Sequence, residues 1–546
     1  MSSNQIAFVA YLDHDNLGVG YIASILLEKG FAITLVDMRE PFPTILESLL
    51  NPRPLITGFS IVFQYHLDEF RNLMTYLREG GLECHFCAGG HYPSFRYKEL
   101  LYLAPQLDSV VLFEGEHTFA ELSEAIRDGR DWKHVTGIAY RDADQVRCTG
   151  LRPLADNLDK FPLPVRKVTR PEVLGRKIVN ILAGRGCYYN CSFCSIRSFY
   201  AQPPGKVKRI RQPEYVVREM QLHYEESGCA VFLFQDDDFP MGGRPGRAWL
   251  EAFCGALRTA GLQHSLLWKV SCRPNEVDEA NISLMMEHGL GMVYLGIESG
   301  TRAGLELMRK QISPETNLAA VRTLKKLGMA YEFGFMLFDP DSTFDTVREN
   351  LGFLESLCGD GSAAVSLGKM LPLAGTRIDE ELRKLKRLRG TSPYEDYAFR
   401  DGLLDEYFRA LSDAFRLWMH GDGGVMTLSR WVHLQAAALR RFYSDGEDTQ
   451  AALWDTVSSA NRFMIRSCQS LADAFRSSSA AVRPAAVTDL ATEVAVKHDE
   501  FATKLSRLSD RIGQLAAKSV VESGALACVG RTLQGSSLFH GADENQ

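Results

Sequence analysis

Short apolar runs alternate with amphipathic stretches along the first 130 residues. The apolar runs span residues 6–12, 32–38, 54–63, 82–90 and 109–115. Helical patterns such as 21–30 and 119–129 lie between them. Continuous apolar strands alternating with helices are typical of a parallel sheet covered on both faces. We therefore expect a doubly wound, Rossmann-like α/β domain over residues 1–135, with a ligand site beyond the carboxyl ends of its strands.

Residues 136–175 follow a different pattern. The stretch GIAYRDADQVRCTG predicts a short β-ribbon. Pro153, Pro162, Pro164 and Pro171 come after it and disfavour regular structure. This part is interpreted as a ribbon followed by a linker.

A second alternation of strands and helices begins near residue 176. Its apolar runs span 178–184, 230–238, 266–272, 292–298, 331–338 and 363–371. Helical stretches such as 213–228 and 315–328 separate them. Six successive units predict a partial (β/α)6 barrel over residues 176–380, open where a full barrel has eight units.

Strand signals fade after the barrel, and residues 381–546 predict a helical C-terminal domain. In the stretch DEYFRALSDAFRLWMH, the large apolar residues recur at helical spacing. They are Tyr407, Phe408, Leu411, Phe415 and Trp418. These side chains are expected to form one buried face.

The composition of the 546 residues is that of an ordinary globular chain, with 45% hydrophobic and 24% charged residues. A net charge of −7 argues against a general nucleic-acid binder. The basic run of Lys206, Lys208, Arg209 and Arg211 is interpreted as a solvated surface. No apolar stretch is long enough to span a membrane, and no signal peptide is evident, so a cytoplasmic protein is expected.

The twelve cysteines are expected to be reduced thiols or metal ligands. Six scattered ones are expected in the core: Cys148, Cys229, Cys254, Cys358, Cys468 and Cys528. Cys84 and Cys87 form a C-x2-C pair within an apolar run. On a strand, residues three apart point to opposite faces, so these two thiols are also expected in the core.

The motif GRGCYYNCSFC carries the strongest chemical signal. It places Cys187, Cys191 and Cys194 at C-x3-C-x2-C spacing directly after the first barrel strand. Three close thiols can hold a [4Fe–4S] cluster and leave one iron open for a ligand. Two alternatives are incidental core thiols and a structural zinc site, which would need a fourth ligand; the next histidine is His223.

This cysteine spacing at the end of the first strand of a six-unit barrel resembles the radical S-adenosylmethionine (SAM) superfamily. Phe193, just before the last cysteine, fits the family pattern. The resemblance implies SAM contacts at the ends of later strands. The implied residues are Asp236 and Asp237 in QDDDF, Arg273 in CRP, Glu298 in LGIESG and Phe335 in GFMLFDPDST. In QDDDF, acids replace the usual Gly-Gly-Glu.

The N-terminal domain resembles the cobalamin-binding domain that precedes the barrel in one branch of this superfamily. The segments NLGVGYIAS, GFS, GGHYPS and EGEHTFAEL carry the likeness. The implied cobalamin contacts are Asn16, Gly18, Tyr21, Ser60, Gly89, Gly90, His91, Glu114, Gly115 and Glu116. The cobalt-ligating motif D-x-H-x-x-G is not matched, because His14 lies four residues before Gly18. We therefore expect no histidine beneath cobalt, which favours methyl transfer as a radical.

The resemblance implies a cobalamin-dependent radical SAM methyltransferase with a [4Fe–4S] cluster, SAM and methylcobalamin as cofactors. One SAM methylates cob(I)alamin, and a second yields a 5′-deoxyadenosyl radical that removes hydrogen from the substrate. The substrate radical then takes the methyl group. The expected substrate is a small molecule methylated at an unactivated carbon or at phosphorus, in natural-product biosynthesis. No catalytic side chain is assigned beyond those that bind cofactors, and a flavodoxin or ferredoxin is the expected reductant.

Three alternatives remain at this point. The same two domains also perform oxidative cyclisation or rearrangement without methyl transfer. The methylthiotransferases share the barrel, but they carry a second cysteine triad and a small β-domain that this chain lacks. A non-catalytic corrinoid or iron–sulfur sensor would bind the cofactors without turning SAM over.

Overall fold

The computed structural model describes residues 4–12, 15–166, 170–443, 447–477 and 483–522. The chain divides into two compact units that are not contiguous in sequence. The first unit contains residues 1–169, 184–211 and 372–397, and the second contains 170–183, 212–371 and 398–546. Each unit is described by itself below.

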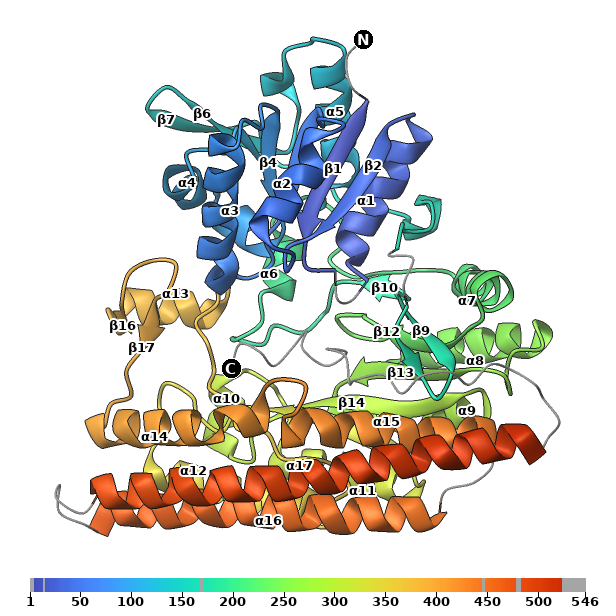
Figure 1. Cartoon of the computed structure of the whole chain (residues 1–546), viewed down its shortest axis with the longest axis vertical. Helices are drawn as coiled ribbons and strands as arrows, with labels where there is room; N and C mark the ends of the chain where they lie inside the picture. The colour runs from blue at the N-terminus through green and yellow to red at the C-terminus, as the bar shows by residue number, and fades with distance from the viewer. Residues whose placement is uncertain (1–3, 13–14, 167–169, 444–446, 478–482, 523–546) are drawn as a thin grey trace. The chain divides into compact units, whose positions relative to one another are not determined.

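A seven-stranded sheet with the order β2-β1-β3-β4-β5-β6-β7 is the framework of the first unit. Its strands are β1 (Gln5–Ala10), β2 (Ala32–Asp37), β3 (Ile56–Ser60), β4 (His85–Gly89), β5 (Ser109–Val111), β6 (Ile138–Asp142) and β7 (Gln145–Cys148). The first five strands are parallel, which confirms the predicted doubly wound fold. The expected β-ribbon is the antiparallel pair β6–β7, which extends the same sheet beyond β5 (Figure 1).

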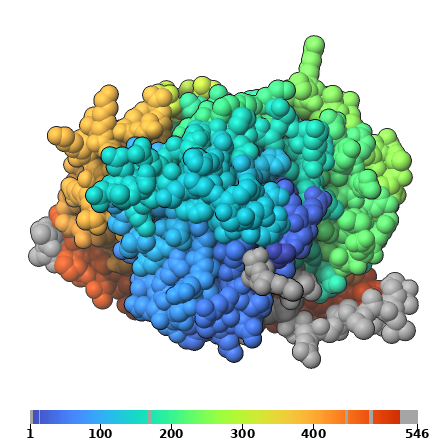
Figure 2. All heavy atoms as spheres, turned by 90° about the horizontal axis from the view of Figure 1, so that it is seen from above, coloured from blue at the N-terminus to red at the C-terminus, as the bar shows by residue number. Residues whose placement is uncertain are grey.

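Helices cover both faces of this sheet. They are α1 (Leu17–Glu28), α2 (Phe42–Leu50), α3 (Leu67–Glu79), α4 (His91–Leu103) and α5 (Glu116–Arg127). Alternate residues of β1 enter different apolar clusters: Ala7 and Val9 pack with α2, α3 and α4, whereas Phe8 packs with α1 and α5. Two buried faces explain why these strands are continuously apolar. In the space-filling view, the N-terminal residues form a continuous blue-to-cyan surface (Figure 2).

Two further segments complete the first unit. The cysteine segment, residues 184–211, contains β10 (Gly184–Arg185), α6 (Ile196–Ala201) and β11 (Arg209–Ile210), and β10 pairs with β11. The docking segment, residues 372–397, contains α13 (Arg377–Lys384), β16 (Leu388–Arg389) and β17 (Asp396–Tyr397). Both segments lie beyond residue 180 in the chain, yet their contacts place them with the N-terminal sheet.

The second unit is built on a sheet of order β15-β14-β13-β12-β9-β8. Its strands are β8 (Glu172–Val173), β9 (Arg176–Ile181), β12 (Cys229–Phe234), β13 (Leu267–Cys272), β14 (Leu290–Glu298) and β15 (Ala330–Phe335). The five strands from β9 to β15 are parallel, as in a partial barrel, and β8 is antiparallel to β9. The fold class expected from the sequence is confirmed.

The run 363–371 differs from the expected sixth strand. It makes one isolated parallel bridge, between Phe338 and Lys369, and is otherwise not a strand. The side chain of Asn461, on α16, forms hydrogen bonds with backbone groups of this run. Asn461 accepts from the Val365 N–H at 3.0 Å and donates to the Ala363 carbonyl at 2.8 Å. A side chain from the C-terminal region thus replaces part of a strand ladder.

Helices alternate with these strands and then continue to the C-terminal region. They are α7 (Pro213–Ser227), α8 (Gly243–Thr259), α9 (Glu279–Glu287), α10 (Arg302–Leu307), α11 (Pro314–Lys326), α12 (Phe344–Cys358), α14 (Gly402–Met419), α15 (Val425–Tyr443), α16 (Glu447–Ser477) and α17 (Arg483–Glu522). The long helices α16 and α17 pack side by side (Figure 1). Short 3-10 turns occupy Gln64–His66, Trp132–His134, Leu158–Lys160 and Pro274–Glu276.

Helix α15 covers one face of the second sheet. Its residues Trp431, Leu434 and Ala438 pack against strand residues such as Val231 and Met292. The opposite face packs on α8, where Phe234 and Trp268 meet Phe253. The predicted apolar face of α14 is confirmed, with Tyr407, Leu411, Phe415 and Trp418 all buried. Phe408 is half-buried.

The scattered thiols are mostly in the core, as expected. Cys229, Cys254, Cys358 and Cys468 are buried, and Cys528 lies outside the described residues. The prediction for Cys148 is wrong: it is exposed on β7, the edge strand of the first sheet. Cys84 and Cys87 enter apolar clusters on opposite faces of that sheet, as their spacing predicts. Burial raises the pKa of the Cys87 thiol to about 12, so it stays protonated.

Candidate cofactor-binding sites

The three clustered cysteines lie in the loop between β10 and α6. All three are half-buried. The Cys194 N–H donates to the Cys191 carbonyl at 3.3 Å, which closes a tight turn. Gly186, one residue before Cys187, has φ +83°, and a Cβ there would lie 1.9 Å from the Val207 carbonyl oxygen. Only glycine fits where β10 runs this close to the segment leading into β11.

The donor set fits an iron–sulfur cluster. Thiolates are the usual ligands of such clusters, and half-buried thiols on one loop remain accessible to iron. Within the described part of the chain, no group of three or more His, Cys, Asp or Glu side chains stands in metal-holding geometry. Assigning the cluster to Cys187, Cys191 and Cys194 therefore rests on their spacing, their exposure and the domain that contains them.

The predicted cobalamin residues gather at the carboxyl edge of the first sheet. Asn16 follows β1 and caps α1, where its side chain accepts from the Val19 N–H at 3.1 Å. Gly18 is exposed in the first turn of that helix, and Ser60 ends β3. Gly89 ends β4, and Gly90 is the N-cap residue of α4. Asp13 and His14 lie outside the described residues, so the expectation about cobalt ligation stays a prediction.

His91 is the first residue of α4 and faces the cysteine segment. Its ring stacks on Phe199 of α6, with centroids 4.1 Å apart and planes 9° apart. Its Nδ1 lies 3.4 Å from the Ser195 hydroxyl, one residue after Cys194. Burial lowers the pKa of His91 to about 4, so the ring is neutral near pH 7. His91 thus links the cobalamin-binding edge to the cysteine loop.

Glu114, Gly115 and Glu116 follow β5, and both carboxylates bind arginines of the cysteine segment. Glu114 lies 3.0 Å from Arg185 and 2.8 Å from Arg209, and Glu116 lies 2.6 Å from Arg185. Burial acts to raise the pKa of Glu114, but Arg209 and Arg185 outweigh it and lower that pKa. These acids anchor the cysteine segment to the strand edge.

The interpretation of the basic run as a solvated surface is therefore wrong. Lys208, Arg209 and Arg211 are buried, and only Lys206 is exposed. Arg209 pairs with Glu114, and Arg211 lies 3.5 Å from Asp159. The partners are distant in sequence, so a reading of the run alone gave no signal of them.

Tyr21 is buried on α1. The Arg185 guanidinium lies over its ring, 4.9 Å from the centroid. The same guanidinium lies 5.4 Å from the ring centroid of Phe161, and the two rings are themselves 6.0 Å apart. Contacts with two aromatic rings stabilise a buried cation. Arg185 was not among the predicted site residues; its position two residues before Cys187 was the available signal.

In the second unit, the predicted SAM residues lie at the carboxyl ends of successive strands. Asp236 follows β12 and is buried, where its carboxylate accepts from the Ala183 N–H at 3.0 Å. Asp237 is exposed. Arg273 follows β13 and is buried; its guanidinium donates to the Lys310 carbonyl and to Asn275 Oδ1 at 3.2 Å. These contacts hold the Arg273 side chain in one orientation.

Glu298 ends β14 at an irregularity in the ladder to β15. Its φ of +66° is unusual for a residue with a Cβ, and such strain is typical of ligand sites. Lys310 lies 3.1 Å from its carboxylate and was missed by the sequence analysis. Phe335 ends β15 and is fully buried, with its ring stacked on Phe353 of α12. Phe193, the remaining SAM residue, is half-buried in the cysteine loop of the first unit.

Charged residues also lie on the α15 side of the second sheet. Glu332 of β15 pairs with Lys269 of β13, and its second oxygen lies 3.4 Å from Arg430 of α15. Tyr294 of β14 is the register partner of Glu332. These residues lie on the same face of the sheet as the apolar residues that pack against α15. No local motif marked them, because their partners come from separate strands and a distant helix.

Two family models match the chain in the regions described above. A B12-binding domain matches residues 5–123, and the radical SAM superfamily matches residues 181–354. Together with the doubly wound sheet and the partial barrel, these matches show that the chain is a cobalamin-dependent radical SAM enzyme. Cobalamin, SAM and a [4Fe–4S] cluster are its cofactors.

Named relatives and a solved structure agree with this class. An uncharacterised methyltransferase of Pyrococcus horikoshii is 28% identical over 67% of this chain and 77% of the relative. The anaerobic magnesium-protoporphyrin IX monomethyl ester cyclase of Rubrivivax gelatinosus is 29% identical over 61% of this chain and 60% of the cyclase. The structure of the cobalamin-dependent S-adenosylmethionine radical enzyme OxsB, with aqua-cobalamin and S-adenosylmethionine bound, has a TM-score of 0.65 and 17% identity, covering 96% of this chain and 82% of that one. The last likeness shows a shared fold.

A search of the helices within the described residues found none with the length and apolar character needed to cross a membrane.

Proposed function

We propose that this enzyme transfers a methyl group from methylcobalamin to an unactivated carbon or phosphorus centre of a small molecule. The observation that carries the proposal is the make-up of the first unit. That compact unit contains both the three-cysteine loop and the glycine-rich edge of the B12-binding sheet. His91 and Glu114 join the two directly. A methyltransferase among the relatives, matched over 77% of its length, supports the same direction.

The bound cofactors supply the radical and the methyl group, and the protein positions them and excludes water. In the first unit, Cys187, Cys191 and Cys194 would hold the cluster, and the strand-end residues Gly89 and Gly90 would face the corrin. In the second unit, Arg273 is suited to a carboxylate, because its guanidinium is buried and already oriented. Glu298, with one oxygen bound by Lys310, is suited to accept hydrogen bonds from hydroxyl groups.

A cyclase is the second candidate function, because the magnesium-protoporphyrin ester cyclase shares 29% identity over 348 residues. The two functions differ in the fate of the SAM methyl group, and the difference can be measured without knowing the substrate. A natural-product scaffold, an acidic metabolite and a phosphorus compound all remain candidate substrates. A flavodoxin or ferredoxin remains the proposed reductant.

The test begins with anaerobic reconstitution in the presence of hydroxocobalamin, followed by iron, sulfide and cobalt analysis. About four irons and one cobalt per chain are expected. The loaded enzyme is then incubated with reductant and SAM that carries a labelled methyl group, and cobalamin is extracted. Labelled methylcobalamin supports methyl transfer. Cleavage of SAM with no label on cobalamin would favour the cyclase, and iron without cobalt would overturn the methylcobalamin proposal.

A further inference from the structure

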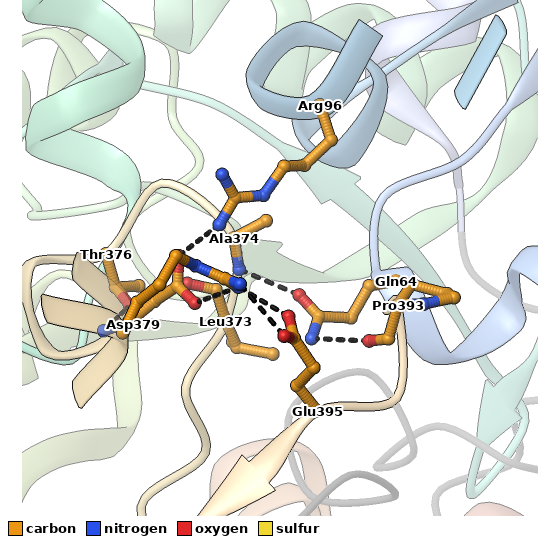
Figure 3. A network of polar contacts seen from close by, with 9 residues as sticks. Gln64, Arg96, Leu373, Ala374, Thr376, Asp379, Pro393 and Glu395 are labelled. Carbon is orange, nitrogen blue, oxygen red and sulfur yellow. Dashed lines mark hydrogen bonds and ion pairs between the residues drawn. The ribbon is translucent and has the colours of Figure 1, made fainter. Parts of the chain in front are cut away.

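The docking segment, residues 372–397, has no role in the function described above. In the chain it lies between the barrel and the C-terminal helices of the second unit. Its contacts nevertheless belong to the first unit, with the cobalamin-binding sheet and the cysteine segment. The polar contacts around Gln64 and Asp379 that hold it are drawn in Figure 3.

Gln64 binds both ends of the docking segment with one side chain. Its Oε1 accepts from the Ala374 N–H at 2.8 Å, and its Nε2 donates to the Pro393 carbonyl at 2.9 Å (Figure 3). Gln64 lies four residues after β3 ends at Ser60, one of the predicted cobalamin residues. An amide that satisfies two backbone groups fixes the separation between them.

Asp379 forms the second anchor. It is buried at 2% exposure and receives Arg96 of α4 on one oxygen and Arg383 of its own helix on the other, at 3.0 Å (Figure 3). Arg383 extends the chain of charges to Glu395 at 2.9 Å. Thr376 caps the same helix by accepting from the Asp379 N–H at 3.3 Å. The network therefore links α4, α13 and Glu395, the residue just before β17.

Close apolar packing accompanies these polar anchors. Gly375 has φ +80°, and a Cβ there would lie 2.5 Å from the ring of Phe95 on α4. Ala374 joins the apolar cluster that also contains Phe199 of the cysteine segment. The Tyr394 hydroxyl accepts from the Asp68 N–H of α3 at 3.0 Å. The docking segment therefore packs closely against the N-terminal domain through both polar and apolar contacts.

The docking segment also touches the cysteine loop itself. The Ile378 N–H donates to the Ser192 carbonyl at 2.9 Å, and both residues are fully or nearly fully buried. Ser192 follows Cys191 and precedes Phe193. From the other side, His91 stacks on Phe199 and lies next to Ser195. The cysteine loop therefore contacts the docking segment at Ser192 and the cobalamin-binding edge through His91.

We propose that the docking segment positions the cysteine loop relative to the cobalamin-binding sheet, with Asp379 and Gln64 as its positioning residues. The inference rests on the proposed function, because it concerns the spacing between that site's two cofactors. Reactions between held groups are sensitive to small displacements, and about 1 Å can cost 100-fold in rate. Because the docking segment contacts both the cysteine loop and the cobalamin-binding sheet, it keeps the spacing between them constant.

The test uses reconstituted full-length enzyme and the variants Asp379→Asn and Gln64→Met. Glu121→Gln is the matched control, because Glu121 pairs with Arg152 in the same unit away from both segments. Iron, sulfide and cobalt are measured first. The cluster is then reduced, and the relaxation rate of the cob(II)alamin electron-spin signal reports the distance between the two centres. Limited proteolysis reports opening of residues 372–397.

We expect Asp379→Asn and Gln64→Met to retain iron and cobalt but to show an altered relaxation rate. Proteolysis within 372–397 should be about tenfold faster than in the wild type. Glu121→Gln should match the wild type in both measurements. Wild-type relaxation and proteolysis in both variants would overturn the inference alone. If Asp379→Asn does not fold, Gln64→Met decides. Wild-type enzyme that binds iron but no cobalt would overturn the proposed function and this inference with it.

Discussion

The two parallel sheets of this protein differ in the side chains that their faces carry. The first sheet buries apolar side chains on both faces, against α1 and α5 on one side and α2, α3 and α4 on the other. The second sheet is apolar on the face toward α8. Its other face changes character along the strands, from an apolar contact with α15 to the charged group of Lys269, Glu332 and Arg430.

The difference shows where each sheet keeps its chemistry. In the first sheet the predicted cofactor residues lie at or just beyond the strand ends, and the strands themselves are mostly apolar. In the second sheet, charged side chains occupy the strands themselves. Substitutions within strands should therefore have different consequences in the two units.

The largest effect is expected from removing a cluster ligand. Cys191→Ala should abolish iron binding and SAM cleavage, because the remaining two thiols cannot hold the cluster. Iron and sulfide analysis and the release of 5′-deoxyadenosine measure this. Cys148→Ala, at the exposed cysteine of β7, should behave like the wild type. Full SAM turnover by Cys191→Ala would show that the cluster is held elsewhere.

A buried charge tests the contrast between the strands directly. Glu332→Gln removes the carboxylate shared by Lys269 and Arg430 and should cost about 3–5 kcal/mol of unfolding free energy. Thr57→Val, in β3 of the first sheet, removes a buried hydroxyl that hydrogen-bonds to the weak Cys84 thiol, and should cost at most about 1 kcal/mol. Denaturant melts give both values. Equal costs would remove the distinction between the sheets.

The edge of the second sheet offers a smaller effect. Asn461→Ala deletes hydrogen bonds to the Ala363 and Cys358 carbonyls and to the Val365 N–H. Leaving these buried groups unpaired should cost about 2–3 kcal/mol. Gln469→Ala, on the same helix, is the control and should change stability little. Increased hydrogen exchange confined to 363–371 would confirm the mechanism, and unchanged exchange there would contradict it.

A further effect depends on pH and concerns the first sheet. Burial lowers the pKa of His85 on β4 to about 4, so the folded protein binds this proton less readily than the unfolded chain does. The contribution of His85 to the free energy of unfolding is fully present above pH 6.5. It falls as the pH drops toward 4, by at most about 1.4 kcal/mol per pH unit. His85→Gln does not titrate, so its melts should depend less on pH over that range. Identical slopes would exclude His85 as the source.

Much of the fold could be predicted because strands and helices alternate with clear periodicity. Each of the five parallel strands in both sheets lies within, or within two residues of, an expected apolar run. The sixth barrel strand could not be predicted correctly, because Asn461, about 100 residues later, binds the backbone of Ala363 and Val365 in place of a strand partner. Tertiary contacts of this kind leave no trace in local periodicity.

The predicted cofactor residues also divide into those that a local motif marks and those whose role depends on a distant partner. Cys187, Cys191 and Cys194 were visible because a cluster requires its ligands at close spacing on one loop. The roles of Arg209, Lys310 and Asp379 were not, since each depends on a partner brought near by the fold. The assignments of Glu114 and Glu116 to cobalamin stay predictions, and the structure adds that both acids bind Arg185.

The interleaved order of the two units has a consequence for how the protein is made. The chain passes between the units after residues 169, 183, 211, 371 and 397. At ordinary ribosomal speeds, the docking segment is synthesised roughly 10–40 s after the cysteine segment. Throughout that interval the nascent cysteine loop lacks its Ile378 partner. The first unit is therefore complete only after residue 397 has been made, and a chain cut after that residue still lacks part of the second unit.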